Sequence, residues 1–127
     1  MKISILTVFS GIIAAISVLL SAWLSHSSDQ LSLTQVSNLQ TALNFAFIHC
    51  LAIFIAALFY RQQPTRLTFV AAALFSIGLV LFSSLIVAKT FISIGILSKL
   101  TPFGGIAFTL GWLVLGISTF KEGNKPK

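Results

Sequence analysis

The chain has 127 residues, of which 57% are hydrophobic and 8% are charged, and its formal net charge is +6. A soluble domain carries about 25% charged residues because water has to solvate its surface, so this composition excludes an ordinary soluble domain and indicates a single membrane domain over residues 1–127. The basic residues flank apolar runs and form no basic stripe with interleaved aromatic residues, which argues against nucleic acid as a partner.

The first apolar run, residues 3–24, begins directly after Lys2 and in this respect resembles a secretory signal peptide. It is about 22 residues long, whereas the apolar region of a signal peptide has about 7–15 residues. No good cleavage site follows it, since Ser21, Ala22 and Trp23 match the small-residue pattern poorly. We therefore expect a first transmembrane helix that is retained.

Three further apolar runs follow, at residues 41–60, 67–88 and 101–120. Crossing about 30 Å of hydrocarbon takes about 20 helical residues, and each of these runs is long enough. Backbone polar groups in lipid have to be paired within the segment, which makes each run a helix. The fold class predicted is therefore all-α, an integral membrane four-helix bundle.

The links between the runs differ in character. Residues 61–66 are short and polar, and Pro64 discourages helix continuation, so we expect a tight hairpin turn on the cytoplasmic side. Residues 25–40 are longer and less polar, with Asp29 placed to cap a helix and apolar residues at helical spacing after it. We expect an interfacial helix there that bends into, or continues as, the second span; a structured loop is the alternative.

Two more segments lie outside the apolar runs. Residues 91–100 are mostly apolar and are interrupted by Gly95. The segment is expected either to re-enter the membrane or to lie along its surface, and the sequence does not choose between the two. Residues 121–127 carry charges together with glycine, asparagine and proline, and we expect them to form a flexible cytoplasmic tail.

The distribution of Lys and Arg predicts the orientation. Six of the eight basic residues belong to the side that holds both termini and the 61–66 turn, and the opposite side has Lys89 and Lys99. Because cytoplasmic loops of membrane proteins are enriched in Lys and Arg, both termini are expected in the cytoplasm. The six are Lys2, Arg61, Arg66, Lys121, Lys125 and Lys127.

Few residues offer chemistry. The two carboxylates, Asp29 and Glu122, both lie outside the spans, whereas ion-coupled transporters and proton relays place carboxylates at membrane depth. The single cysteine, Cys50, excludes an internal disulfide. We therefore expect no catalytic residues, no metal site and no cofactor.

His49 is the most informative polar residue, because an ionisable side chain inside a span is a functional candidate by default. The other interpretation is packing, in which a neutral imidazole makes a hydrogen bond to a neighbouring helix. Its helix face carries Ala52 and Ala56, which favours packing. His26, Asn44 and Ser83 are the remaining candidates for a polar packing or functional role, and a haem or metal held by His26 and His49 is a distant third interpretation.

The start of the fourth run has its own pattern. Thr101 is expected as the N-cap and Pro102 as the first helical residue. Gly104, Gly105 and Gly111 then permit close approach of another helix. The N-terminal end of this helix is also a candidate site for an anionic lipid headgroup.

Four patches carry a family resemblance: SAWLSH at 21–26, TAL through HCLA at 41–52, G through LFSS at 78–84, and TPFGG through GW at 101–112. In these patches the chain resembles the YgdD family of small bacterial membrane proteins, a family of unknown function with eukaryotic relatives. It departs from the family pattern at Ser21 and Ser25, where glycines are usual, and at Phe45 and Ala46, where Tyr-Gln is usual. The resemblance implies four helices and the bacterial inner membrane, and it implies no particular activity.

These observations favour an interaction, accessory or scaffold protein without catalytic activity. Its expected partners are the lipid bilayer and either a larger membrane-protein complex or copies of itself. The alternative is an oligomeric small-molecule transporter or channel with His49 lining the pathway. A haem or redox subunit built on His49 and His26 ranks last.

Overall fold

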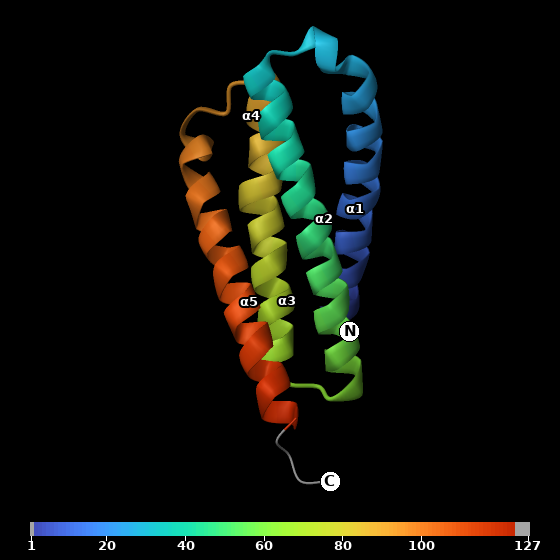
Figure 1. Cartoon of the computed structure of the whole chain (residues 1–127). Helices are drawn as coiled ribbons and strands as arrows, with labels where there is room; N and C mark the ends of the chain where they lie inside the picture. The colour runs from blue at the N-terminus through green and yellow to red at the C-terminus, as the bar shows by residue number, and fades with distance from the viewer. Residues whose placement is uncertain (1, 124–127) are drawn as a thin grey trace.

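The computed structural model describes residues 2–123, and these fold into four long helical rods that lie roughly side by side (Figure 1). All four are long and apolar enough to span a membrane, and residues 2–123 contain no strand. The prediction of an all-α protein with four membrane-spanning helices is confirmed. The elements are α1 (Lys2–Ser27), η1 (Ser28–Gln30), α2 (Leu33–Gln62), α3 (Arg66–Gly78), η2 (Leu79–Ser84), α4 (Leu85–Phe91), η3 (Gly95–Leu100) and α5 (Thr101–Gly123).

The third rod is not uniform. It runs from Arg66 to Phe91 and joins α3 to α4 through η2, which is a π-helix of six residues. Thr65 caps its lower end, since its hydroxyl accepts a hydrogen bond from the Thr68 amide. Insertions of π-helix inside an α-helix are rare and often accompany functional sites, so η2 is a candidate functional segment.

The link between the first two rods agrees in part with the prediction for residues 25–40. These residues contain the end of α1, the short 3₁₀ turn η1 and the first two turns of α2, so the expected helix is present from Leu33 and continues as the second span. Asp29 lies in η1 and is not the cap. The N-cap of α2 is Ser32. Its hydroxyl accepts a hydrogen bond from the Gln35 amide, and the Gln35 side chain accepts one from the Ser32 amide, so the two residues form a capping box.

The second link corrects the prediction for residues 91–100. Gly95 adopts a φ of +53°, a conformation that favours glycine, and the chain then enters η3 and continues directly into α5. Gly95–Leu100 therefore extends the fourth rod and is neither a re-entrant nor a surface-lying piece, while residues 92–94 form the link from α4. Thr101 consequently has helical φ and ψ of −53° and −44° and does not act as an N-cap.

The lower end also differs from the prediction for residues 121–127. Helix α5 continues through Gly123, so the first three of these residues belong to a helix. Residues 124–127 lie outside the described part of the chain.

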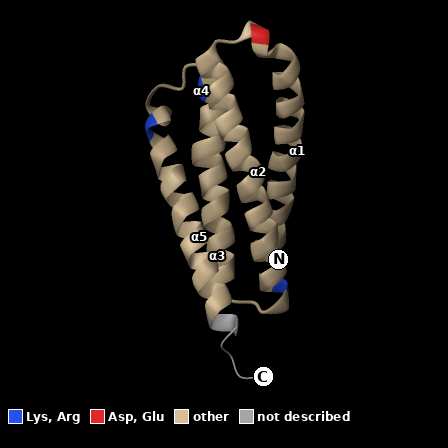
Figure 2. Ribbon diagram, in the orientation of Figure 1, with Lys and Arg blue, Asp and Glu red and all other residues tan. Residues whose placement is uncertain are grey.

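The rods are arranged around a central pair. Helix α2 packs on α3, while α1 lies mainly against α2 and α5 mainly against α3 and η2, so α1 and α5 occupy opposite edges (Figure 1). Half of the apolar window of the second rod is buried but only 17% of that of the first. The bundle is thus open beside α1. Among the residues with described side chains, the charged ones lie near the ends of the rods (Figure 2).

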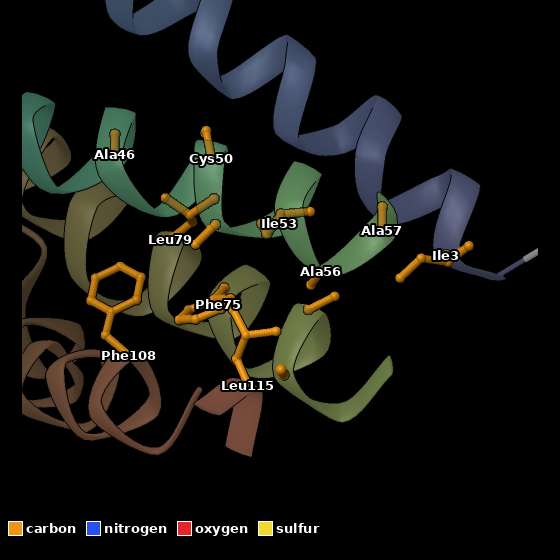
Figure 3. Packing of buried hydrophobic residues seen from close by; sticks show 13 residues of the cluster. Ile3, Ala46, Cys50, Ile53, Ala56, Ala57, Phe75, Leu79, Phe108 and Leu115 are labelled. Carbon is orange, nitrogen blue, oxygen red and sulfur yellow. The ribbon is translucent and has the colours of Figure 1, made fainter. Parts of the chain in front are cut away.

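The core combines small side chains, most of them on α2, with larger ones from α3, η2 and α5 (Figure 3). Alanines on facing sides of α2 and α3 bring these two helices close together, and larger residues fill the space toward α5. Two phenylalanines, Phe75 and Phe108, belong to this core cluster and are 0% and 3% exposed. The larger members of this cluster are Ile3, Ile53, Phe75, Leu79, Phe108 and Leu115.

Candidate functional site

His49 lies in the middle of α2 and is 4% exposed, enclosed by aromatic rings from three rods. The Phe108 ring of α5 stacks on the imidazole with centroids 3.5 Å apart and an interplanar angle of 14°. Phe45, one turn earlier on α2, and Phe75 on α3 lie at 5.7 and 5.6 Å. The polar ring is therefore sealed from lipid by apolar rings.

Both nitrogens of the His49 ring have partners. Trp112 Nε1 donates a hydrogen bond to Nε2 of His49 at 3.1 Å, and Nδ1 lies 2.7 Å from the Phe45 carbonyl oxygen. The indole N–H can only donate and the carbonyl oxygen can only accept. The pair of bonds therefore assigns a neutral imidazole with its proton on Nδ1, bonded to the carbonyl.

Two glycines make room for the stacked rings. A Cβ at Gly78 would collide with the Phe108 ring, and a Cβ at Gly111 would lie 2.7 Å from the ring of Phe75. Each phenylalanine thus lies over a glycine of the facing rod. This exchange of rings brings α5 close enough to α2 for Trp112 to reach His49.

A third glycine sets the approach of α5 to η2. A Cβ at Gly104 would lie 2.5 Å from the Phe82 amide nitrogen and 2.8 Å from the Leu81 carbonyl carbon, so the two backbones nearly touch. Gly105, in contrast, would make only ordinary contact with the ring of Phe82. The structure thus places Gly104 and Gly111 at close helix contacts.

The start of α5 does not have the free helix end on which the expected headgroup site depends. The 3₁₀ helix η3 precedes α5, and the Thr101 amide donates to the Ser98 carbonyl, so the first turn does not present a free helix end. Pro102 follows within the helix and is exposed, and the Thr101 hydroxyl is buried with no hydrogen-bond partner among the described residues.

The remaining sequence candidates lie apart from His49. His26 is exposed in the last turn of α1, where the adjacent Ser25 shares a cleft with Gln40 of α2. Gln40 precedes His49 by nine residues, which is about 13 Å along a helix axis. The two histidines are therefore not brought together, and Asn44 is exposed on the outside of α2.

The arrangement can hold helices together but offers little chemistry. The lone pair at Nε2 that would accept a proton or bind a metal is already bonded to Trp112. No group of three or more His, Cys, Asp or Glu residues suited to a metal ion occurs in the described part of the chain. A base or ligand role for His49 would require Trp112 to move away.

Trp112 is the residue that sequence reasoning missed. It lies in one of the four patches that carry the family resemblance, and an indole N–H inside an apolar span also needs an acceptor. His49 is the acceptor that a neighbouring span supplies. An indole donor in one span and an imidazole acceptor in another were therefore the signal from which the Trp112–His49 bond could have been predicted.

Comparison with known proteins gives a consistent result. Residues 20–105 match the family described as "Protein of unknown function (DUF423)". The chain is 34% identical over 82 residues to UPF0382 membrane protein SH2409 of Staphylococcus haemolyticus, covering 65% of this chain and 66% of that protein. It is 28% identical over 106 residues to a UPF0382 membrane protein of Haemophilus influenzae, covering 83% and 85%.

A third relative supports the assignment. A UPF0382 membrane protein of Staphylococcus epidermidis is 31% identical over 93 residues, with 73% of this chain and 75% of that protein covered. No solved structure matches the chain. The expected class, a bacterial membrane family of unknown function, is thus confirmed, while the YgdD-like name stays a resemblance. The chain belongs to the DUF423 family and is related to the UPF0382 membrane proteins.

Proposed function

We propose that this protein is a non-catalytic component of the bacterial inner membrane that acts by packing its helices against a larger membrane-protein complex or against copies of itself. The observation that carries the proposal is the uneven coverage of the rods. Only 17% of the apolar window of the first rod is buried, against 50% for the second. Helix α1 is therefore held from one side and is free to contact another helix on the other.

The exposed side of α1 suits such a contact. Ala15 and Ala22 are exposed and lie seven residues apart, on one face of the helix. In lipid, where apolar side chains gain little by leaving the solvent, small residues favour association because they let two backbones approach closely.

The His49 environment supports the same proposal. Its two ring nitrogens are bonded inside the chain, and His49 lines neither of the two larger clefts beside α1. A transport pathway along His49, or a haem held by it, would need an open face of the imidazole. We therefore assign His49 a packing role.

The orientation belongs to the proposal as well. Arg61 and Arg66 lie at the end of the bundle at which α1 begins and α5 ends, whereas Lys89 and Lys99 lie at the other end. Since Lys and Arg are enriched on the cytoplasmic side, we place both termini and the turn between α2 and α3 in the cytoplasm.

The test is purification from native membranes in mild detergent, with crosslinking before extraction. The proposal expects a stoichiometric protein partner or a defined homo-oligomer, crosslinked through Ala15→Cys on α1. The matched control is Thr109→Cys, at an exposed position of α5. A monomer without a protein partner, together with a transport or enzymatic activity that His49→Phe abolishes in a folded protein, would refute it.

A further inference from the structure

A cleft of 260 Å³ lies between α1, α2 and the junction of η2 with α4. Small residues of α2, Ala42 and Ala46, belong to its lining, and Ser17 of α1 faces Ser83 and Ser84 across it. The volume is below the roughly 300–1,000 Å³ of pockets that enclose a drug-sized ligand. The cleft is therefore suited to a ligand fragment of one ring with a short stretch of hydrocarbon chain.

The hydroxyl of Ser83, like that of Thr101 near the start of α5, is buried without a hydrogen-bond partner among the described residues, and Ser83 lies deeper in its rod. Ser17 and Ser76 each donate to a carbonyl four residues earlier in the same helix, whereas the Ser83 hydroxyl has no hydrogen-bond partner among the described residues. Ser83 is 3% exposed. It lies in η2, where π-helical geometry displaces the carbonyl four residues earlier from its place in an α-helix.

An unsatisfied hydroxyl in hydrocarbon is costly, by about 1–3 kcal/mol in folded proteins. The Ser83 oxygen itself has almost no exposed surface, so a ligand in the cleft that brings an acceptor satisfies it once the side chain turns about its Cα–Cβ bond toward the lining. Ser84 is exposed in the same cleft and offers a second donor, and the oxygen of Ser17 remains free to accept a further bond.

The depth of Ser83 narrows the class of ligand. The rod from Arg66 to Phe91 has 26 residues, so Ser83 lies about 7 Å from its middle along the axis. With the rod centred in a bilayer whose hydrocarbon is about 30 Å thick, lipid headgroups and ester carbonyls lie about 15 Å from the mid-plane. A phospholipid therefore cannot bring its oxygens to Ser83.

We propose that this cleft binds an isoprenoid quinone, a lipid-soluble ring that carries carbonyl oxygens into the membrane interior. The hydroxyls of Ser83 and Ser84 donate to one carbonyl, the ring lies between α1 and α4 above the alanines of α2, and the tail leaves toward lipid. This binding is independent of the packing function proposed above.

Other occupants fit less well. An acyl chain fills apolar space but has no acceptor for Ser83, and a helix about 10 Å wide is too large for 260 Å³. The larger groove of 480 Å³ between α1 and α3, at Ile5, Phe9 and Ile77, is apolar, so acyl chains suffice there.

The experiment measures binding of a decyl-substituted benzoquinone to the full chain in nanodiscs. We expect saturable binding, with the infrared carbonyl stretch shifted to lower frequency by hydrogen bonding. The double variant Ser83→Ala/Ser84→Ala should weaken binding by about twofold to tenfold or more and abolish the shift, as expected for the loss of one or two hydrogen bonds.

Two matched variants complete the design. Ala88→Leu fills the cleft from α4 and should remove binding. Ser76→Ala removes a buried hydroxyl bonded within its own helix and should leave binding unchanged. All variants are compared at equal helical content. Absence of saturable quinone binding, equal binding of decylbenzene, or binding that survives both Ala88→Leu and the double serine variant would overturn the proposal.

Discussion

Replacing Trp112 by phenylalanine tests how the rods are held together. The change removes the N–H that donates to His49 Nε2 at 3.1 Å and keeps an aromatic ring at the same place. His49 is 4% exposed, so its nitrogen cannot find water as a substitute. Interhelical hydrogen bonds in membranes contribute about 0.6–1.7 kcal/mol, and an unsatisfied buried acceptor costs about 1–3 kcal/mol. We expect the free energy of unfolding to fall by about 1–2 kcal/mol.

A double-mutant cycle isolates the bond itself. His49→Phe keeps a ring that stacks on Phe108, and the double variant His49→Phe/Trp112→Phe leaves neither the donor nor the acceptor. The double variant should therefore be more stable than the sum of the single losses predicts, with a coupling of about 0.6–1.7 kcal/mol.

The assay is reversible unfolding in mixed micelles, followed by circular dichroism. Trp23→Phe is the matched control, because Trp23 packs beside Phe91 and has no such bond to His49. It should show no coupling with His49→Phe. The reasoning would be refuted if the stability losses of the two single variants summed to that of the double variant within about 0.3 kcal/mol. That result would show that the bond does not link α2 to α5.

Three further predictions concern the helix contact, the cap and the orientation. Gly104→Ala should lower the free energy of unfolding by about 1–3 kcal/mol because the new Cβ meets the backbone of η2, whereas Gly116→Ala, with nothing within 4 Å, should have little effect. Ser32→Ala should cost about 0.5–2 kcal/mol and speed amide exchange in the first turn of α2, while Asp29→Ala, which removes the residue wrongly expected as cap, should do neither. In a cysteine-free background, Gln62→Cys should react with an impermeant thiol reagent only from the cytoplasmic side, and Asp29→Cys only from the opposite side; the reverse pattern would invert the proposed orientation.

The number and type of the membrane-spanning helices were predictable because apolar length alone decides them in a bilayer. The ends of the helices were less so. The capping box of Ser32 and Gln35 is a local pattern that sequence reading could have recognised. The turn that leads the chain from α4 into η3 uses the positive φ of Gly95, which the sequence permits but does not require.

The candidate site was predicted only in part. The sequence singles out His49 because an ionisable side chain inside a span is a functional candidate by default, but its partner Trp112 lies 63 residues away and the sequence does not identify it. That pairing depends on how α5 is turned about its axis against α3, which follows from the rings of Phe75 and Phe108 lying over Gly111 and Gly78. Such rotations come from packing and are not encoded in any single helix.

The uneven coverage of the rods makes packing against another protein the central claim. The most direct measurement is the mass of the particle that carries this chain when it is released from native membranes into lipid nanodiscs without detergent. The claim predicts a mass larger than one copy of the chain, with a single stoichiometric composition that is lost when Ala15→Leu and Ala22→Leu enlarge the exposed face of α1. A particle that contains one copy of the chain and lipid alone, unchanged by those substitutions, would contradict it.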